Sequence, residues 1–75
     1  MLKGTRIAVL QHIQPVSIHG QISCDVHFVD PEDPSSQPRV ARLGPEAVDP
    51  HLSPGDRIVL EYLLGAVISV KRAGL

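Results

Sequence analysis

The 75-residue sequence has little of four things that many functions need: cysteine, aromatic side chains, charge of one sign and long apolar runs. The single cysteine, Cys24, cannot form an internal disulfide, so the chain has to fold without that cross-link. Phe28 and Tyr62 are the only Phe, Tyr or Trp residues, which leaves few rings on which nucleic-acid bases can stack. Seven basic and eight acidic side chains give a net charge of −1, so no strong field attracts a polyanion.

The apolar stretches are too short to cross a bilayer. Residues 7–10 form a run of only four, and the stretches at residues 63–64 and 66–68 are separated by Gly65. Residues 1–6 contain a basic pair but no apolar run of the kind found in signal peptides. We therefore expect no contact with a membrane and a cytoplasmic location, which a single cysteine also fits.

Three segments have clear strand patterns. Apolar and polar residues alternate strictly over residues 21–28, which is typical of a half-buried strand. Residues 57–64 form a second run, and residues 66–71 form a third that a tight turn at Gly65 joins to it. The side chains expected to face inward on the first two strands are Ile22, Cys24, Val26, Phe28, Ile58, Leu60, Tyr62 and Leu64. The chain is therefore predicted to be rich in β structure.

Two further strands have weaker patterns. Residues 5–13 contain four consecutive apolar side chains, so this strand is either covered on both faces or bent midway. Pro15 predicts a break or an edge position at its end, because proline cannot donate to a sheet. Residues 39–43 form a short strand that can face either way. The stretch before it, residues 30–38, is rich in proline and acidic residues and predicts an exposed loop.

One short helical turn is expected within residues 44–52. Pro45 is well placed at a first helical position, and Pro50 limits the helix to about one turn. Residues 53–56, Ser-Pro-Gly-Asp, then predict a type II turn in which Gly55 adopts the positive φ. The expected order is three strands, a helical turn and a two-stranded hairpin.

This order matches the five-stranded OB-fold, in which a helix joins the third strand to the fourth. An SH3-like barrel is the alternative, but it usually places its helical turn between the last two strands, where only Gly65 stands here. We predict an all-β fold, with residues 1–75 forming a single domain. The domain is a small five-stranded OB-like barrel with one short helical turn between strands 3 and 4.

Several short motifs carry a resemblance to a family. They are Leu-Lys-Gly at residues 2–4, Glu-Ala-Val at residues 46–48 and Leu-Ser-Pro-Gly-Asp at residues 52–56, followed by an apolar strand and a short last strand. With these the chain resembles the Mop and TOBE domains, OB-like modules that bind molybdate or sit on transporter ATPases. At the level of fold it is also similar to bacterial translation initiation factor one. The resemblance implies an OB-like fold and an oxyanion ligand.

The departures from the Mop pattern fall where an oxyanion would bind. Mop-type sites resemble nests of backbone N–H groups with Ser or Thr hydroxyls near the helical turn and the last hairpin. In this chain Pro45 removes a donor, Ala47 stands in place of serine, and residues 63–66 contain no hydroxyl. An anion that leaves water needs charge-assisted donors in return. Oxyanion binding is therefore the third of the functions considered.

Metal binding and catalysis find little support. Cys24 and His27 have a Cys-x-x-His spacing, but an odd separation on a strand points the two side chains to opposite faces. His12 and His19 can approach across a turn, yet no third ligand is obvious, and structural zinc needs four. No serine lies in a nucleophile motif. We expect no metal, no cofactor and no enzymatic activity.

A nucleic-acid contact is the second function considered. In the OB strand order 1-2-3-5-4 the third and fifth strands are neighbours, which gathers basic residues from both. The candidate contact residues are Arg39, Arg42, Lys71 and Arg72. Against this, both aromatic residues lie on inward faces, and a solvated basic edge that prevents strand pairing explains the same residues.

The apolar content suggests the first function. Hydrophobic residues make up 43% of the chain, more than a barrel of this size readily buries. If even-numbered residues of 57–64 face inward, Val59 and Leu63 face outward, and Val67 joins them. Contiguous exposed apolar surface usually marks an interface, although scattered surface aliphatic residues are an alternative. We expect a non-enzymatic adaptor that acts through protein–protein contacts, most economically as a symmetric homodimer.

Overall fold

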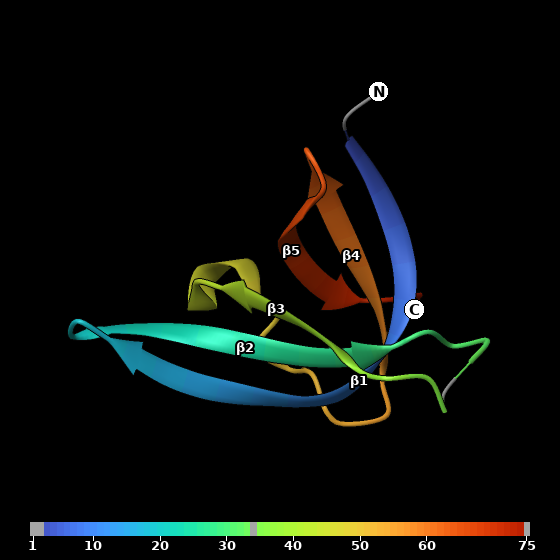
Figure 1. Ribbon diagram of the computed structural model, residues 1–75, viewed down its shortest axis with the longest axis horizontal. Coiled ribbons are helices and arrows are strands. Elements are labelled where there is room, and N and C mark those ends of the chain that lie inside the picture. Colours follow the sequence, from blue (N-terminus) through green and yellow to red (C-terminus); the bar gives the residue numbers. More distant parts are fainter. Residues whose placement is uncertain (1–2, 34, 75) are drawn as a thin grey trace.

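Five strands form one antiparallel sheet in the computed structural model, which describes residues 3–33 and 35–74 (Figure 1). In chain order the elements are β1 (Lys3–Ile18), β2 (Gln21–Val29), β3 (Arg39–Leu43), the 3-10 turn η1 (Pro45–Ala47), β4 (Arg57–Leu63) and β5 (Ala66–Arg72). The strand order in the sheet is β3-β2-β1-β4-β5. The all-β class and the helical turn between the third and fourth strands are confirmed. Within the described residues, no helix has the length and apolar character that crossing a membrane requires.

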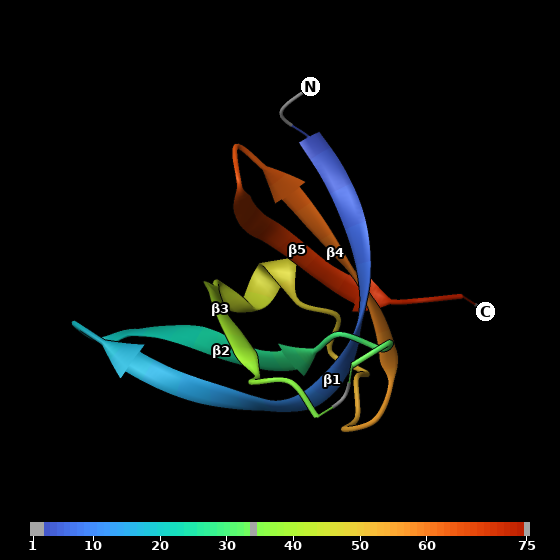
Figure 2. The same cartoon turned by 45° about the vertical axis from the view of Figure 1, so that its right-hand side comes forward.

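β1 is the central strand, and it changes its partner midway. Up to Val9 it pairs with β4, and from Val9 onward it pairs with β2. A register shift between Leu10 and His12 marks a bulge at the point where the strand bends (Figure 2). Ala8 and Leu10 are buried, whereas Ile7 is 42% exposed. The bent alternative expected for this apolar run is therefore confirmed.

The sheet consequently has two arms, which we define by their strands. The first arm consists of the N-terminal half of β1 with β4 and β5, and the second arm consists of the C-terminal half of β1 with β2 and β3. Figures 1 and 2 show the two arms at a wide angle to each other. The buried cluster draws on all five strands and consists of Ala8, Leu10, Val26, Phe28, Leu43, Ile58, Leu60 and Val70. Cys24 and Tyr62 are partly buried against it, as expected.

The break expected at Pro15 is absent. β1 continues to Ile18, and Pro15 lies opposite Cys24 of β2. Past the bend, the other side of β1 pairs with no strand of the described chain, so Pro15 occupies an edge, which was the second expected alternative. The strand ends instead at a two-residue turn, in which His19 and Gly20 have φ angles of 51° and 79°.

The hairpin between β4 and β5 also has a two-residue turn. Leu64 and Gly65 have φ angles of 56° and 82°, the signs that a type I′ turn requires at both central positions. The inward position predicted for Leu64 is wrong, because the strand ends one residue earlier and the side chain is 69% exposed at the tip. The sequence had predicted a turn formed by Gly65 alone, whereas Leu64 and Gly65 form it together.

The turn before β4 forms as expected and helps to hold the bend of β1. The N–H of Asp56 donates to the carbonyl of Ser53 at 3.0 Å, and Gly55 has a φ of 94°. The N–H of Gly55 donates to the carbonyl of Leu10, and the N–H of Leu10 donates to the carbonyl of Asp56, at 2.8 and 2.9 Å. The turn therefore supplies backbone partners where β1 bends away from β4.

The sheet is not closed by hydrogen bonds. The end strands β3 and β5 contact each other, but neither pairs with the other. The segment after η1, and not β3, forms backbone contacts with β5. Val48 forms a parallel bridge with Val70, and the N–H of Asp49 donates to the carbonyl of Val70 at 3.0 Å. The sheet expected to close into a barrel thus stays open between its end strands.

Candidate functional site

The outward side of the first arm is the first candidate, and we call it the outer face. The register of the strands arranges the residues of the outer face in three rows, and each row has one residue from each of β1, β4 and β5. The rows are Ile7, Val59 and Lys71; Thr5, Glu61 and Ser69; and Lys3, Leu63 and Ala66. Ile7 and Leu63 are each 42% exposed, whereas the alternate residues Ile58 and Leu60 are fully buried on the opposite side. The outer face is therefore a solvent-facing surface with apolar side chains in two of its three rows.

The structure brings together two of the three residues expected at an interface. Val59 and Leu63 share the outer face, but Val67 pairs with Tyr62 and packs against the core. The cause is a register shift between Glu61 and Tyr62, which leaves Ile68 as an extra residue in β5 and moves Val67 to the inward side.

Ile7 takes the third place on the outer face, opposite Val59. Sequence reasoning missed it because the consecutive apolar residues of β1 show no alternation from which the facing of each side chain can be read. From the sequence alone, the exposed position of Ile7 could therefore not be distinguished from the buried positions of Ala8 and Leu10. Only the pairing of β1 with β4 separates them.

Glu61 lies in the middle row and gives the outer face its charge pattern. The hydroxyl of Ser69 donates a hydrogen bond to Oε1 of Glu61. This hydrogen bond is the largest cause that lowers the pKa of the Glu61 carboxyl. Desolvation opposes it, and the positive charges of Lys71 and Lys3 add smaller lowering effects. An ionised carboxylate therefore sits between two apolar rows whose ends carry ammonium groups.

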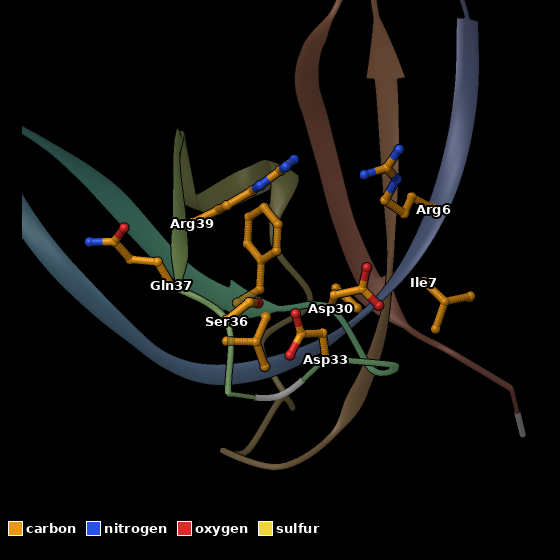
Figure 3. A pocket seen from close by; sticks show the side chains of 10 residues that line it. Arg6, Ile7, Asp30, Asp33, Ser36, Gln37 and Arg39 are labelled. Carbon is orange, nitrogen blue, oxygen red and sulfur yellow. The ribbon is translucent and has the colours of Figure 1, made fainter.

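A groove of about 230 Å³ is the second candidate (Figure 3). It lies where the N-terminal half of β1 passes the connection from β2 to β3. Its apolar lining consists of the buried residues Ala8, Phe28 and Val29. Ile7 borders the groove, but Figure 3 shows its side chain pointing away from it. Its polar lining consists of Arg6, Asp30, Asp33, Ser36, Gln37 and Arg39. Apolar walls with a few polar groups are typical of small-molecule sites.

The charges in the groove are separated by sign. Figure 3 shows the guanidinium groups of Arg6 and Arg39 on one side and the carboxylates of Asp30 and Asp33 on the other. In the part of the chain that the structure describes, neither arginine is within ion-pair distance of a carboxylate. The groove therefore presents two cations and two anions that do not neutralise each other directly.

The four residues of the expected nucleic-acid contact lie on different surfaces. Arg39 lines the groove, Lys71 lies on the outer face, and Arg42 lies on the outward side of the second arm. Arg72 donates hydrogen bonds to the carbonyl of His51 and, at 3.3 Å, to Oδ2 of Asp56. The basic stripe that motivated the nucleic-acid hypothesis is therefore not assembled.

Arg42 forms an ion pair across β2 and β3. Its Nε and Nη2 atoms donate to the two carboxylate oxygens of Asp25 at 2.7 and 2.9 Å. The pair lowers the pKa of Asp25, through the hydrogen bonds first, and raises that of Arg42. Two donor atoms of this guanidinium are therefore already engaged by a carboxylate.

The histidines on the second arm meet in a pair that sequence reasoning did not find. The rings of His12 and His27 stack with centroids 4.0 Å apart and an angle of 14° between their planes, while His19 lies in the hairpin turn. Cys24 points to the other side of β2 from His27, as its odd spacing predicted. Across residues 3–33 and 35–74, no three His, Cys, Asp or Glu side chains form a group that could hold a metal ion.

Comparison of the chain with protein-family models, with characterised proteins and with solved structures finds no match. The resemblance to Mop and TOBE domains therefore stays a prediction from the motifs.

Proposed function

We propose that the chain is a non-enzymatic binding module that acts through protein–protein contacts and docks a second copy of itself on its outer face. The observation behind this proposal is the position of Ile7, Val59 and Leu63 on adjacent strands of one sheet face, with two of them 42% exposed. Apolar residues grouped on the surface of a small domain favour a protein interface. Burying them in a dimer removes apolar area that the core of this chain does not cover.

The charges of the outer face fit a second copy of the chain. Glu61 lies in the middle row, and Lys3 and Lys71 lie at opposite ends of the two outer rows. A two-fold axis offset from Glu61 brings each carboxylate near an ammonium group of the other copy. A face with charge of one sign would repel its own copy, whereas this one carries both signs and is self-complementary.

The proposed fold class is an OB-like barrel that is open on one side. The strand order β3-β2-β1-β4-β5 is the cyclic OB order 1-2-3-5-4 cut between its third and fifth strands. The position of η1 between β3 and β4 also supports this class over the SH3-like alternative. Partly open barrels of this class bind their ligands and partners on exposed faces, which is consistent with a binding module.

Light scattering and sedimentation velocity over a wide range of protein concentration test the self-association. We expect a concentration-dependent dimer for the unchanged chain and a monomer for Leu63→Glu, because a carboxylate cannot be buried without a partner. Ile22→Glu is the matched control: Ile22 is 55% exposed near the tip of the second arm, so this variant is expected to dimerise normally. Thermal unfolding verifies that both variants fold. A monomer at every concentration, or a dimer that Leu63→Glu leaves intact, contradicts the proposal.

A further inference from the structure

We propose that the groove binds a free apolar α-amino acid. In this arrangement Arg6 and Arg39 hold the α-carboxylate, and Asp30 and Asp33 hold the α-ammonium group. The site does not depend on the proposed self-association, although Ile7 borders both the groove and the outer face. The two arginines, the opposing carboxylates and the apolar floor together define the site.

The two arginines converge from strands that are not neighbours in the sheet. Arg6 lies on β1 opposite Leu60 of β4, and Arg39 opens β3 opposite Phe28 of β2. Since Leu60 and Phe28 face the core, both arginine side chains project from the inward side of the sheet, where they line one groove (Figure 3). The planar donor fork of a guanidinium matches the two oxygens of a carboxylate. Two such forks on one wall therefore form a receptor for one carboxylate.

The opposite wall is built by a tight turn that holds its carboxylates in place. The N–H of Asp33 donates to the carbonyl of Asp30 at 3.1 Å, which brings the two side chains to one wall. One oxygen of Asp30 accepts the N–H of Glu32 at 2.8 Å, and one oxygen of Asp33 accepts the hydroxyl of Ser35 at 3.1 Å. Each carboxylate retains a second oxygen that can accept a hydrogen bond from an ammonium group.

The combination of walls selects a zwitterion over a simple anion. A phosphate dianion would be attracted by Arg6 and Arg39 but repelled by the two carboxylates on the facing wall. An α-amino acid carries its carboxylate and its ammonium group on one carbon, so it satisfies both walls at once. A peptide carries these two charges at opposite ends of its chain, and each peptide end satisfies only one wall.

The floor and the size of the groove suit a single apolar residue. Ala8, Phe28 and Val29 are at most 5% exposed and form an apolar surface below the charged walls. The volume of about 230 Å³ lies below the range of roughly 300–1,000 Å³ that is usual for sites of drug-sized ligands. A ligand the size of leucine therefore fills the groove, with its side chain on Phe28.

Titration of the complete isotope-labelled chain by two-dimensional NMR tests the proposal with three probes: L-leucine, L-leucinamide and N-acetyl-L-leucine. We expect leucine to bind with a dissociation constant of about 0.1–1 mM and to shift the amide signals of Arg6, Ser36 and Arg39. Leucinamide lacks the carboxylate and N-acetyl-leucine lacks the ammonium group, so each leaves one wall unpaired and is expected to bind at least about tenfold more weakly. Equal affinity for the three probes overturns the proposal, as does tighter binding of inorganic phosphate at the same signals. The absence of shifts with leucine up to about 20 mM also overturns it.

Variants of the arginines provide the second part of the test. Arg6→Gln and Arg39→Gln are each expected to weaken leucine binding by about tenfold or more, because each removes a charge-assisted hydrogen bond. Arg57→Gln is the matched control, since Arg57 lies on β4 outside the groove and its loss is expected to leave the affinity unchanged. Unchanged affinity in both groove variants contradicts the assignment. If a variant fails to fold, the comparison of the three probes on the unchanged chain still decides the question.

Discussion

The hydroxyl of Ser69 on β5 donates a hydrogen bond to the carboxylate of Glu61 on β4, in the middle row of the outer face. The two residues lie directly opposite each other in the register, so the bond spans a single strand pair. The bond fixes the Glu61 carboxylate, which is the one acidic group of the outer face. The other charges of this face are Lys3 and Lys71, at opposite ends of the two outer rows. The position of this charge is therefore set by the β4–β5 pairing.

Ser69→Ala is expected to reduce the stability of the fold at neutral pH. The pKa of Glu61 in the folded chain is below its ordinary value of 4.5, so its stabilising effect is present above that value and is lost as the pH falls through the folded pKa. The difference between Ser69→Ala and the unchanged chain should therefore shrink between about pH 5 and about pH 2. Urea unfolding over this pH range measures it.

Ser23→Ala is the matched control for that measurement. Ser23 lies on β2, and its hydroxyl forms no hydrogen bond with the described part of the chain. Its stability difference from the unchanged chain should not vary with pH. A Ser69→Ala difference that is the same at both ends of the pH range would contradict a role for the Glu61 carboxylate.

Leu64→Asn is expected to stabilise the β4–β5 hairpin. Leu64 has a φ of 56°, and a left-handed conformation of this kind costs an ordinary L-residue about 1–2 kcal/mol. Asparagine tolerates this conformation, and Asn-Gly is the preferred pair of a type I′ turn, so a gain of about 1 kcal/mol in the free energy of unfolding is expected. Because the leucine side chain is 69% exposed, its removal sacrifices little packing.

Thermal and urea unfolding measure the gain at Leu64. Ile68→Asn serves as the control, because Ile68 is also exposed in this hairpin but has no positive φ. It should bring no gain in stability. If Leu64→Asn leaves the stability unchanged or lowers it, the turn does not strain the leucine.

Val67 and Leu63 are expected to respond differently to truncation, although both were predicted to lie on one interface. Val67 packs against the core, so Val67→Ala should lower the free energy of unfolding by about 1–2 kcal/mol. Leu63 is solvent-facing in the single chain, so Leu63→Ala should change it by no more than about 0.5 kcal/mol when measured on the monomer. Urea unfolding at low protein concentration compares the two variants. Equal losses would contradict the inward position of Val67.

Local features of the sequence predicted a large part of the fold correctly. The Pro-Gly turn before β4 and the proline-led turn η1 each depend on a few adjacent residues whose backbone preferences agree with their final structure. Strict alternation identified β2 and also showed that Cys24 and His27 face opposite ways. These features required no knowledge of which strand lies beside which.

The candidate sites were less predictable, because each depends on strand register. One extra residue in β5 turned Val67 inward, and the bulge in β1 after Leu10 brought His12 opposite His27. A shift of one residue exchanges the two faces of a strand, so alternation beyond a bulge predicts the wrong side. No pattern within either strand marks the position of these bulges.

The sequence by itself determined that this protein is all-β, where most of its strands and turns lie, and that it has no internal disulfide, because these properties follow from composition and from neighbouring residues. Only the tertiary structure decided that Ile7 joins Val59 and Leu63 on the outer face and that Arg6 and Arg39 line the same groove. Arg6 and Arg39 belong to strands separated by β2, and their convergence follows from the bend of β1. Contacts of this kind depend on long-range pairing and on single-residue shifts of register, whose physical cause is the packing of the whole sheet.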